Sequence, residues 1–288
     1  MDISAFSELE ALTESFMKRL SNFALDLGLT RFPQHLNTFL TSLFFFLAIH
    51  QTFAPLISGW LSSSFRKMNS RGKNNWSIRV VSQLHALAIV PLALRALDSP
   101  VLDKDRAFGW DEDKSGSLQA IASAYFVWDT LDAIINYTDF GFIVHGLACS
   151  MIYLLSFTPF LSYYAARCLL WESSTIFLNI HWFLDKTNRT GSTFQLINGI
   201  LLLATFFGMR LVYGAYVSYN FFFTLYDVRD KVPWSYLFVY GVGNVVLQGL
   251  NVVWFVKMIR ALQKRFTSNP SVNRTSVKAS RKLDAKKE

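Results

Sequence analysis

Long apolar runs recur along the 288-residue chain and constrain its fold more than any other feature of the sequence. Between Asn37 and Met258 they approach the ~20 residues that a helix needs to cross the hydrocarbon core of a bilayer. The composition agrees, with 52% hydrophobic, 16% aromatic and 17% charged residues and a mean hydropathy of +0.27. Because a spanning segment must satisfy its own backbone hydrogen bonds, we expect an all-α, polytopic membrane helical bundle.

Prolines, charged loops and polar turns separate the apolar runs. Pro33 precedes the first run, and Pro55 is expected to kink it. We expect about seven transmembrane helices, at residues 36–61, 76–97, 117–136, 141–157, 160–183, 194–217 and 234–258. The sixth can extend through the aromatic residues at 221–223.

The N-terminal segment begins with acidic residues, so it does not have the basic start of a cleaved signal peptide. Its apolar residues recur at spacings of three and four, which predicts an amphipathic helix: Leu9, Leu12, Phe16, Leu20, Phe23 and Leu27. Two positions for this helix remain open. It lies flat on the membrane surface, or it packs against the bundle.

The excess positive charge lies at the C-terminus. The net charge is +8, and residues 257–288 carry ten Lys or Arg against two acidic residues. A basic tail after an apolar helix is typical of the cytosolic side, where it can contact anionic lipid, so the charge does not indicate a nucleic-acid partner. The loop after the second span is acidic and the loops after the first and fifth are basic, which predicts an N-terminus outside and a C-terminus in the cytosol.

Ionisable side chains interrupt the apolar spans, and at membrane depth each needs a partner, water or a function. Asp129 and Asp132 lie three residues apart in the third span, and His145 in the fourth and His85 in the second reach a comparable depth. Carboxylates and imidazoles near one level can perform acid–base chemistry or bind a metal. A hydrogen-bonded network that joins the helices is an equal alternative.

Polar residues also recur at helical spacing on the last three spans, namely Cys168, Glu172, Thr175, Asn179 and Trp182, then Gln195, Asn198 and Thr205, then Asn244, Gln248 and Asn251. Several inward-facing polar stripes in one bundle predict a partly hydrated cavity, whereas helix adhesion explains any single stripe. Arg167 and Arg210 are expected near the outer ends of their helices, where their side chains can reach lipid headgroups.

The order of these residues resembles a known family. Tyr125, Asp129, Tyr137-Thr-Asp139, His145, Pro159-Phe160, Trp171-Glu-Ser-Ser-Thr175, Asn179 and Trp182-Phe183 resemble the TLC domain of the TRAM proteins, the Lag1-type ceramide synthases and the CLN8 proteins. The resemblance implies a multispanning protein of the endoplasmic reticulum or Golgi membrane, with a lumenal N-terminus and a role in sphingolipid or phospholipid synthesis, sensing or transport. It divides the chain into an amphipathic segment (1–35), a first transmembrane helix and loop (36–67), the TLC domain (68–265) and a basic cytosolic tail (266–288).

The ceramide synthases of this family join a fatty acyl-CoA to a sphingoid base, and the resemblance implies a His-His pair, a later His-Asp and a further Asp in their active site. Here His145 is followed by Gly146, Trp171-Glu172 replaces His-Asp, and Thr175 replaces the last Asp. These departures predict that the chain does not synthesise ceramide.

Three functions remain open. The leading hypothesis is lipid binding, sensing or homeostasis, with a cavity lined by His85, Tyr125, Cys168, Thr175, Asn179, Asn198, Asn244 and Gln248. The second is an acyl-CoA-dependent lipid acyltransferase, with His145 as general base, Asp129 or Asp132 orienting it, and Glu172 nearby. The third is a trafficking adaptor that binds protein cargo through its tail. We expect a membrane lipid as partner (sphingolipid, phospholipid or fatty acyl chain), no metal and no cofactor, and acyl-CoA only as the substrate of an enzyme.

Four Asn-X-Ser/Thr triplets test the expected orientation. Asn75, Asn136, Asn188 and Asn273 all fall on the cytosolic side of this topology, so we expect none of them to carry a glycan. The measurement is the mass of the protein before and after glycosidase treatment, and a glycosidase-sensitive shift would contradict the orientation.

Overall fold

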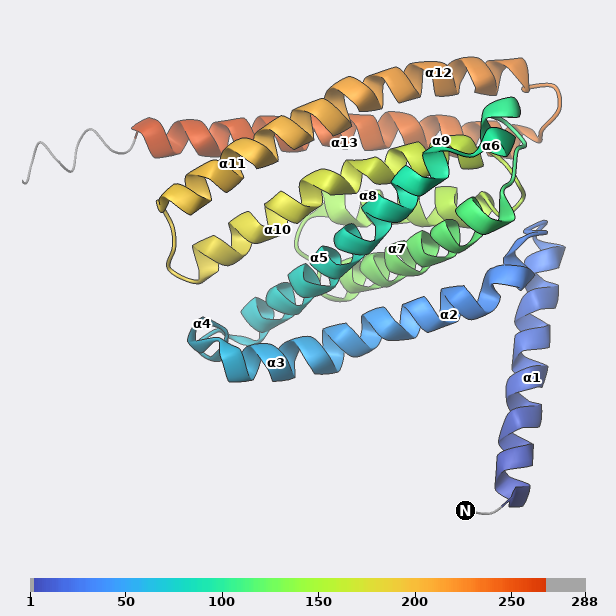
Figure 1. Ribbon diagram of the computed structural model, residues 1–288, viewed down its shortest axis with the longest axis horizontal. Coiled ribbons are helices and arrows are strands. Elements are labelled where there is room, and N and C mark those ends of the chain that lie inside the picture. The colour runs from blue at the N-terminus through green and yellow to red at the C-terminus, as the bar shows by residue number, and fades with distance from the viewer. Residues whose placement is uncertain (1–2, 268–288) are drawn as a thin grey trace, which may run out of the picture.

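The computed structural model describes residues 3–267 and shows a bundle of helices joined by short loops (Figure 1). Among these residues there is no strand, which confirms the expected all-α class. Residues 1–2 and 268–288 lie outside the described part, and with them most of the predicted basic tail and Asn273.

Seven helical segments correspond to the seven expected spans, several of them built from consecutive elements. They are α2 (Phe32–Ala48), η1 (Ile49–Phe53) and α3 (Ala54–Leu61); α5 (Ser70–Leu97); α7 (Ser117–Ile135); α8 (Phe140–Leu155); α9 (Ser162–Leu169), η3 (Leu170–Glu172) and α10 (Ser173–Lys186); α11 (Thr193–Thr205), η4 (Phe206–Tyr213) and α12 (Gly214–Asp227); and α13 (Trp234–Thr267). The shorter α4 (Ser63–Arg66), α6 (Pro100–Lys104) and η2 (Glu112–Gly116) lie in the connections.

Four of these segments are long and apolar enough to cross a bilayer by themselves: Phe32–Leu61, Ser70–Leu97, Thr193–Asp227 and Trp234–Gln263. The remaining three segments are too short or too polar to meet this criterion. α8 is apolar but only 16 residues long, while α7 and the α9–α10 segment carry most of the ionisable residues noted in the sequence. α7 packs most extensively against α8 and α2, and its polar residues Asp129 and Asp132 face α5 and η1. The membrane-bundle class is therefore confirmed, and seven crossings stay a prediction.

Two spans contain a π-helical turn, and neither span is interrupted there. η1 lies just before Pro55, and the first span continues as one helical segment through it to Leu61. η4 lies in the middle of the sixth span, which runs without interruption to Asp227. π-turns often occur at functional positions, and here each carries a buried polar side chain, His50 in η1 and Arg210 in η4.

α1 (Ile3–Asp26) runs across the direction of the bundle helices (Figure 1). Its C-terminal half packs on the start of α2, where Ala24 is buried beside Phe32 and Leu36. Leu12, Phe16 and Phe23 are instead 68%, 55% and 62% exposed. One end of the helix therefore packs against the bundle and an apolar stripe stays uncovered, while its position on the membrane surface stays a prediction.

Gly146 marks the closest approach of α7 and α8. A Cβ atom added at Gly146 would lie 2.5 Å from Thr130 Oγ1 and 3.1 Å from Thr130 Cα. Thr130 cannot easily withdraw, because its hydroxyl donates to the Phe126 carbonyl at 2.6 Å and lies 3.0 Å from Ser150 Oγ. The position at which the ceramide synthases carry their second histidine therefore has no room here even for alanine.

We expect Gly146→Ala to destabilise the protein by about 1–3 kcal/mol, because the two helices must separate to admit the methyl group. Thermal unfolding in detergent measures the effect. Gly249→Ala on α13 is the matched control, since a Cβ there meets nothing within 4 Å, and its melting temperature should stay close to that of the parent. Equal melting temperatures for both variants would contradict the close α7–α8 contact.

Candidate functional site

Arg210 occupies the centre of the bundle. It lies in η4 and its side chain is buried, with the residue 6% exposed. The prediction that Arg210 lies near a helix end was wrong, because the sixth span continues to Asp227 and position 210 falls near its middle. Arg167 differs, since it pairs with Asp103 at 3.3 Å at the edge of the bundle and lies against the ring of Tyr163.

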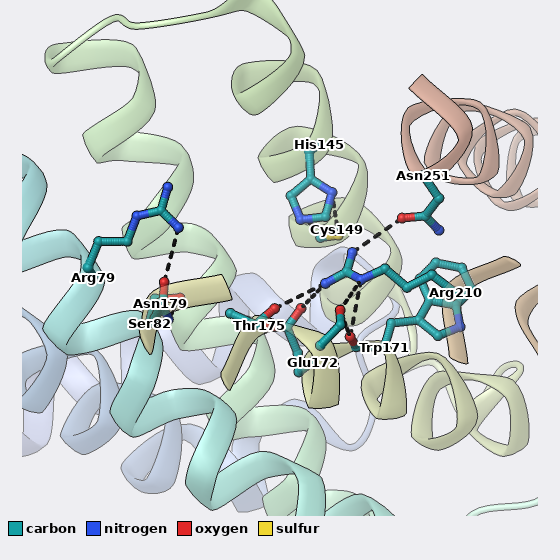
Figure 2. Close-up of polar contacts among 11 residues, drawn as sticks. Arg79, Ser82, His145, Cys149, Trp171, Glu172, Thr175, Asn179, Arg210 and Asn251 are labelled. Carbon is teal, nitrogen blue, oxygen red and sulfur yellow. Dashed lines mark hydrogen bonds and ion pairs between the residues drawn. The ribbon is translucent and has the colours of Figure 1, made fainter. Parts of the chain in front are cut away.

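The guanidinium of Arg210 is surrounded by acceptors (Figure 2). Nη2 donates to Glu172 Oε1 at 3.3 Å and to Thr175 Oγ1 at 3.1 Å. Nε donates to the Trp171 carbonyl at 3.1 Å and to Ser174 Oγ at 2.9 Å, and Nη1 donates to Asn251 Oδ1 at 3.2 Å. η3 and the first turn of α10 thus supply all but one of the acceptors. The Arg210–Glu172 pair has no net charge and is hydrogen-bonded, the condition under which a buried charge is tolerated.

A narrow cavity lies beside this pair, between α8, α9, α12 and α13. It runs along α13 from Tyr240 to Asn251, a length of about 16 Å at 1.5 Å per residue. Its volume is about 50 Å³. One end is apolar and the other is polar, with His145, Glu172, Arg210 and Asn251 among its lining residues.

Three polar atoms that belong to the cavity lining are buried without a hydrogen-bond partner among the described residues. They are Trp171 Nε1, Asn251 Nδ2 and Asn244 Oδ1, and their residues are 6%, 1% and 6% exposed. A buried polar atom left unpaired costs about 1–3 kcal/mol. Two unused donors, on Trp171 and Asn251, and one unused acceptor, on Asn244 seven residues before Asn251 on α13, indicate that the cavity can take polar groups of a ligand.

The cavity brings together four of the predicted site residues: His145, Glu172, Cys168 and Asn244. The His145 ring lies 5.3 Å from the ring of Trp254, and Cys149 Sγ is 3.9 Å and 3.8 Å from its Nδ1 and Nε2. Because Sγ is almost equally far from both nitrogens, it is not aligned with either one. No hydrogen bond or ion pair within the described chain joins His145 to Asp129 or Asp132.

Asp129 and Asp132 belong to a different polar cluster. Asp132 Oδ1 lies 3.8 Å from His50 Nε2 and accepts from Asn74 at 3.5 Å and Asn136 at 2.9 Å. Asp129 lies close enough to Arg79 for electrostatic interaction. These contacts tie α7 to η1 and α5, as expected for a network that joins helices.

The remaining predicted residues do not line the cavity. His85 stacks on Tyr125 with ring centroids 3.7 Å apart, and Asn179 accepts from Arg79 at 3.0 Å and donates to Ser82 at 3.1 Å. Asn198 donates to the Phe177 carbonyl at 2.9 Å, and Gln248 donates to Ser218 at 3.0 Å. Thr175 accepts from Arg210. Sequence reasoning missed Arg79 and His50, although each is an ionisable residue within or next to an apolar run.

Comparisons with known proteins show the family of the chain. The family model described as TLC domain matches residues 75–260, more than half of the chain. An uncharacterized TLC domain-containing protein of Schizosaccharomyces pombe is 36% identical over 240 residues, 83% of this chain and 82% of that protein. Topoisomerase I damage affected protein 4 of Saccharomyces cerevisiae is 27% identical over 80% of this chain and 85% of its own. Human TLC domain-containing protein 4 is 28% identical over 78% of this chain and 86% of its own.

Replacing Arg210 by Met leaves Glu172 buried without its counter-charge, and we expect a loss of about 3–5 kcal/mol of stability. Arg210→Met combined with Glu172→Gln should recover part of this loss, because no unpaired charge remains. Arg229→Met is the control, since its ion pair with Asp230 is exposed and should contribute less than about 1 kcal/mol. The midpoint of thermal unfolding compares the variants, and an unchanged midpoint in Arg210→Met would contradict the central role of the pair.

Proposed function

Because the chain belongs to the TLC-domain family of membrane proteins, we propose that it binds a membrane lipid in the cavity beside Arg210 and so takes part in lipid homeostasis. The observation that carries the proposal is the amphipathic lining of this cavity. Leu161, Phe221 and Leu247 contribute to its apolar part, and Trp171 and Asn251 bring unpaired donors to its polar part. A lipid likewise has an apolar acyl chain and a polar group at one end of it.

Selectivity for a lipid must come from the polar end of the cavity. An acyl chain that leaves the bilayer for an apolar cavity exchanges one apolar environment for another, so it gains little hydrophobic free energy. Pairing the unused groups of Trp171, Asn251 and Asn244 removes a cost that the empty site carries. The polar group of the ligand is therefore expected to determine its affinity.

The polar end also restricts the charge of the ligand group. Arg210 and Glu172 neutralise each other, so the site needs no further counter-charge. Trp171 and Asn251 can donate, and Asn244 Oδ1 can accept. This set suits an uncharged group that both accepts and donates hydrogen bonds, such as an amide or a hydroxyl-bearing ester, and a sphingolipid or another acyl lipid can supply it.

We also propose that the protein resides in the endoplasmic reticulum or Golgi membrane, with its N-terminus in the lumen and its C-terminus in the cytosol. The alternation of basic and acidic loops supports this orientation. The family resemblance supports the compartment.

Acyl transfer is the second candidate function, and the observation that favours it is the position of His145 in the cavity lining. A general base needs an orienting partner or a substrate proton within reach. The ring of His145 contacts Cys149 and aromatic residues, and no described carboxylate hydrogen-bonds to it. The geometry supports lipid binding better than it supports catalysis.

Trp171→Phe removes one unpaired donor and preserves most of the ring volume, so it tests the lipid site directly. We expect the purified variant to retain severalfold less co-purifying lipid by mass spectrometry than the parent, with a similar melting temperature, because one hydrogen bond contributes about 1 kcal/mol. Trp60→Phe, at a residue 81% exposed, is the matched control and should retain the lipid of the parent. Equal lipid in Trp171→Phe and the parent would contradict the site.

His145→Ala separates binding from catalysis in the same experiment. A lipid-binding role predicts that cells expressing this variant keep the lipid composition of the parent, because the polar contacts at Trp171 and Asn251 remain. A lipid composition that matches the deletion strain, with normal folding and localisation, would favour the acyltransferase.

A further inference from the structure

A second hollow lies between α3 and the start of α5. Its lining residues, from His50 to Ser77, precede those of the lipid cavity in the chain. Its volume is about 600 Å³, it is open on one side, and we refer to it as the α3–α5 groove. His50, Asn74 and Ser77 give it polar groups, Leu56 and Phe65 give it apolar surface, and Arg66 and Lys73 give it positive charge. It shares no lining residue with the lipid cavity.

The positive charge of the groove is not compensated. No carboxylate is among its lining residues. Lys73 lies over the ring of Phe65 at 5.8 Å and makes no ion pair with any described residue. Arg66 uses Nη1 for the carbonyls of Gly59 and Trp60, at 2.9 Å and 3.1 Å, which leaves its other nitrogens free of partners in the described chain. By contrast, Lys257 and Arg167 pair with acidic residues elsewhere in the structure.

The polar groups of the groove are held in place. His50 Nε2 lies 2.9 Å from Asn74 Oδ1 and 3.8 Å from Asp132, and Gln51 donates to His50 Nδ1 at 3.2 Å. The π-turn η1 carries His50, so a local change in helical winding places this side chain among the groove residues. The shape of the groove therefore depends on packed elements at its base.

The exposed residues of α3 indicate which end of the groove faces the bilayer surface. Leu56, Trp60 and Leu61 on α3 are 66%, 81% and 66% exposed, so the outer face of α3 is apolar up to its last residue. An exposed tryptophan at the end of a spanning helix is typical of the membrane interface. Arg66 and Lys73 follow this apolar face in the chain, so we expect the end of the groove that they line to lie near the phosphate groups of the bilayer.

We propose that the α3–α5 groove binds the phosphate group of an anionic membrane phospholipid. Lys73 and the free nitrogens of Arg66 pair with the phosphate oxygens, as Lys and Arg do in other phosphate sites. Leu56 and Phe65 contact the apolar part of the same lipid. The site is independent of the lipid cavity, which takes an uncharged group.

The test uses the full-length protein in detergent and native mass spectrometry, with phosphatidic acid and phosphatidylcholine of identical acyl chains. We expect the parent to prefer phosphatidic acid and Lys73→Gln to bind it about tenfold more weakly, the effect of losing one charged hydrogen bond. Lys67→Gln, the same change at an exposed lysine outside the groove, should match the parent. Phosphatidylcholine, whose phosphate charge is offset by the choline, should bind the parent more weakly than phosphatidic acid and should lose less affinity in Lys73→Gln.

Three results would overturn the proposal. Equal weakening in Lys73→Gln and Lys67→Gln would mean general attraction to a basic surface. Equal binding of the two lipids by the parent would mean that the groove does not prefer an anionic headgroup. Inorganic phosphate that displaces phosphatidic acid at equal concentration would assign the groove to a soluble phosphate instead of a lipid. Lipid bound in the cavity should be unaffected by Lys73→Gln, so this experiment can fail while the cavity proposal stands.

Discussion

A guanidinium inside a membrane bundle must keep both a counter-charge and several hydrogen-bond acceptors, because the surrounding medium supplies neither. Arg210 meets this requirement with a carboxylate, two hydroxyls, one carbonyl and one amide oxygen. These groups come from η3, α10 and α13, so the ion pair fixes three segments relative to η4. Of these segments, η3, η4 and α13 also line the cavity, so the hydrogen bonds of Arg210 hold part of its wall in place.

The helices and their inward-facing residues could be predicted from the periodicity of the sequence. The contacts between residues far apart in the chain could not. Apolar runs gave the helical segments, and polar residues at helical spacing indicated Glu172 and Asn251 as inward-facing. The partner of Glu172 lies 38 residues later in the chain, and helical spacing within one span carries no information on such a contact. For the same reason His85 and Asn179, although correctly recognised as polar residues at depth, were expected at a cavity that they do not line.

At the positions where this chain departs from the residues that the resemblance implies for the ceramide synthases, the residues present have structural roles. Gly146 allows α7 and α8 to approach, Thr175 accepts a hydrogen bond from Arg210, and the Trp171 carbonyl accepts another. Each residue thus has a packing or hydrogen-bonding role in place of an acid or base. A site whose ionisable groups already satisfy one another is better suited to hold a ligand than to transfer its protons.

The bilayer determines which contacts can be selective. Because every lipid already has its acyl chains in an apolar solvent, the apolar lining of a cavity distinguishes lipids mainly by fit, and polar contacts must supply the remaining preference. The chain places such contacts at two depths. The neutral Arg210–Glu172 pair with its unpaired neighbours lies deep in the bundle, while the uncompensated Lys73 and Arg66 lie at the end of α3. If both proposed sites bind lipid, an uncharged group reaches the first at low cost in desolvation and a phosphate reaches only the second, so the two sites are expected to select different lipids by depth and charge.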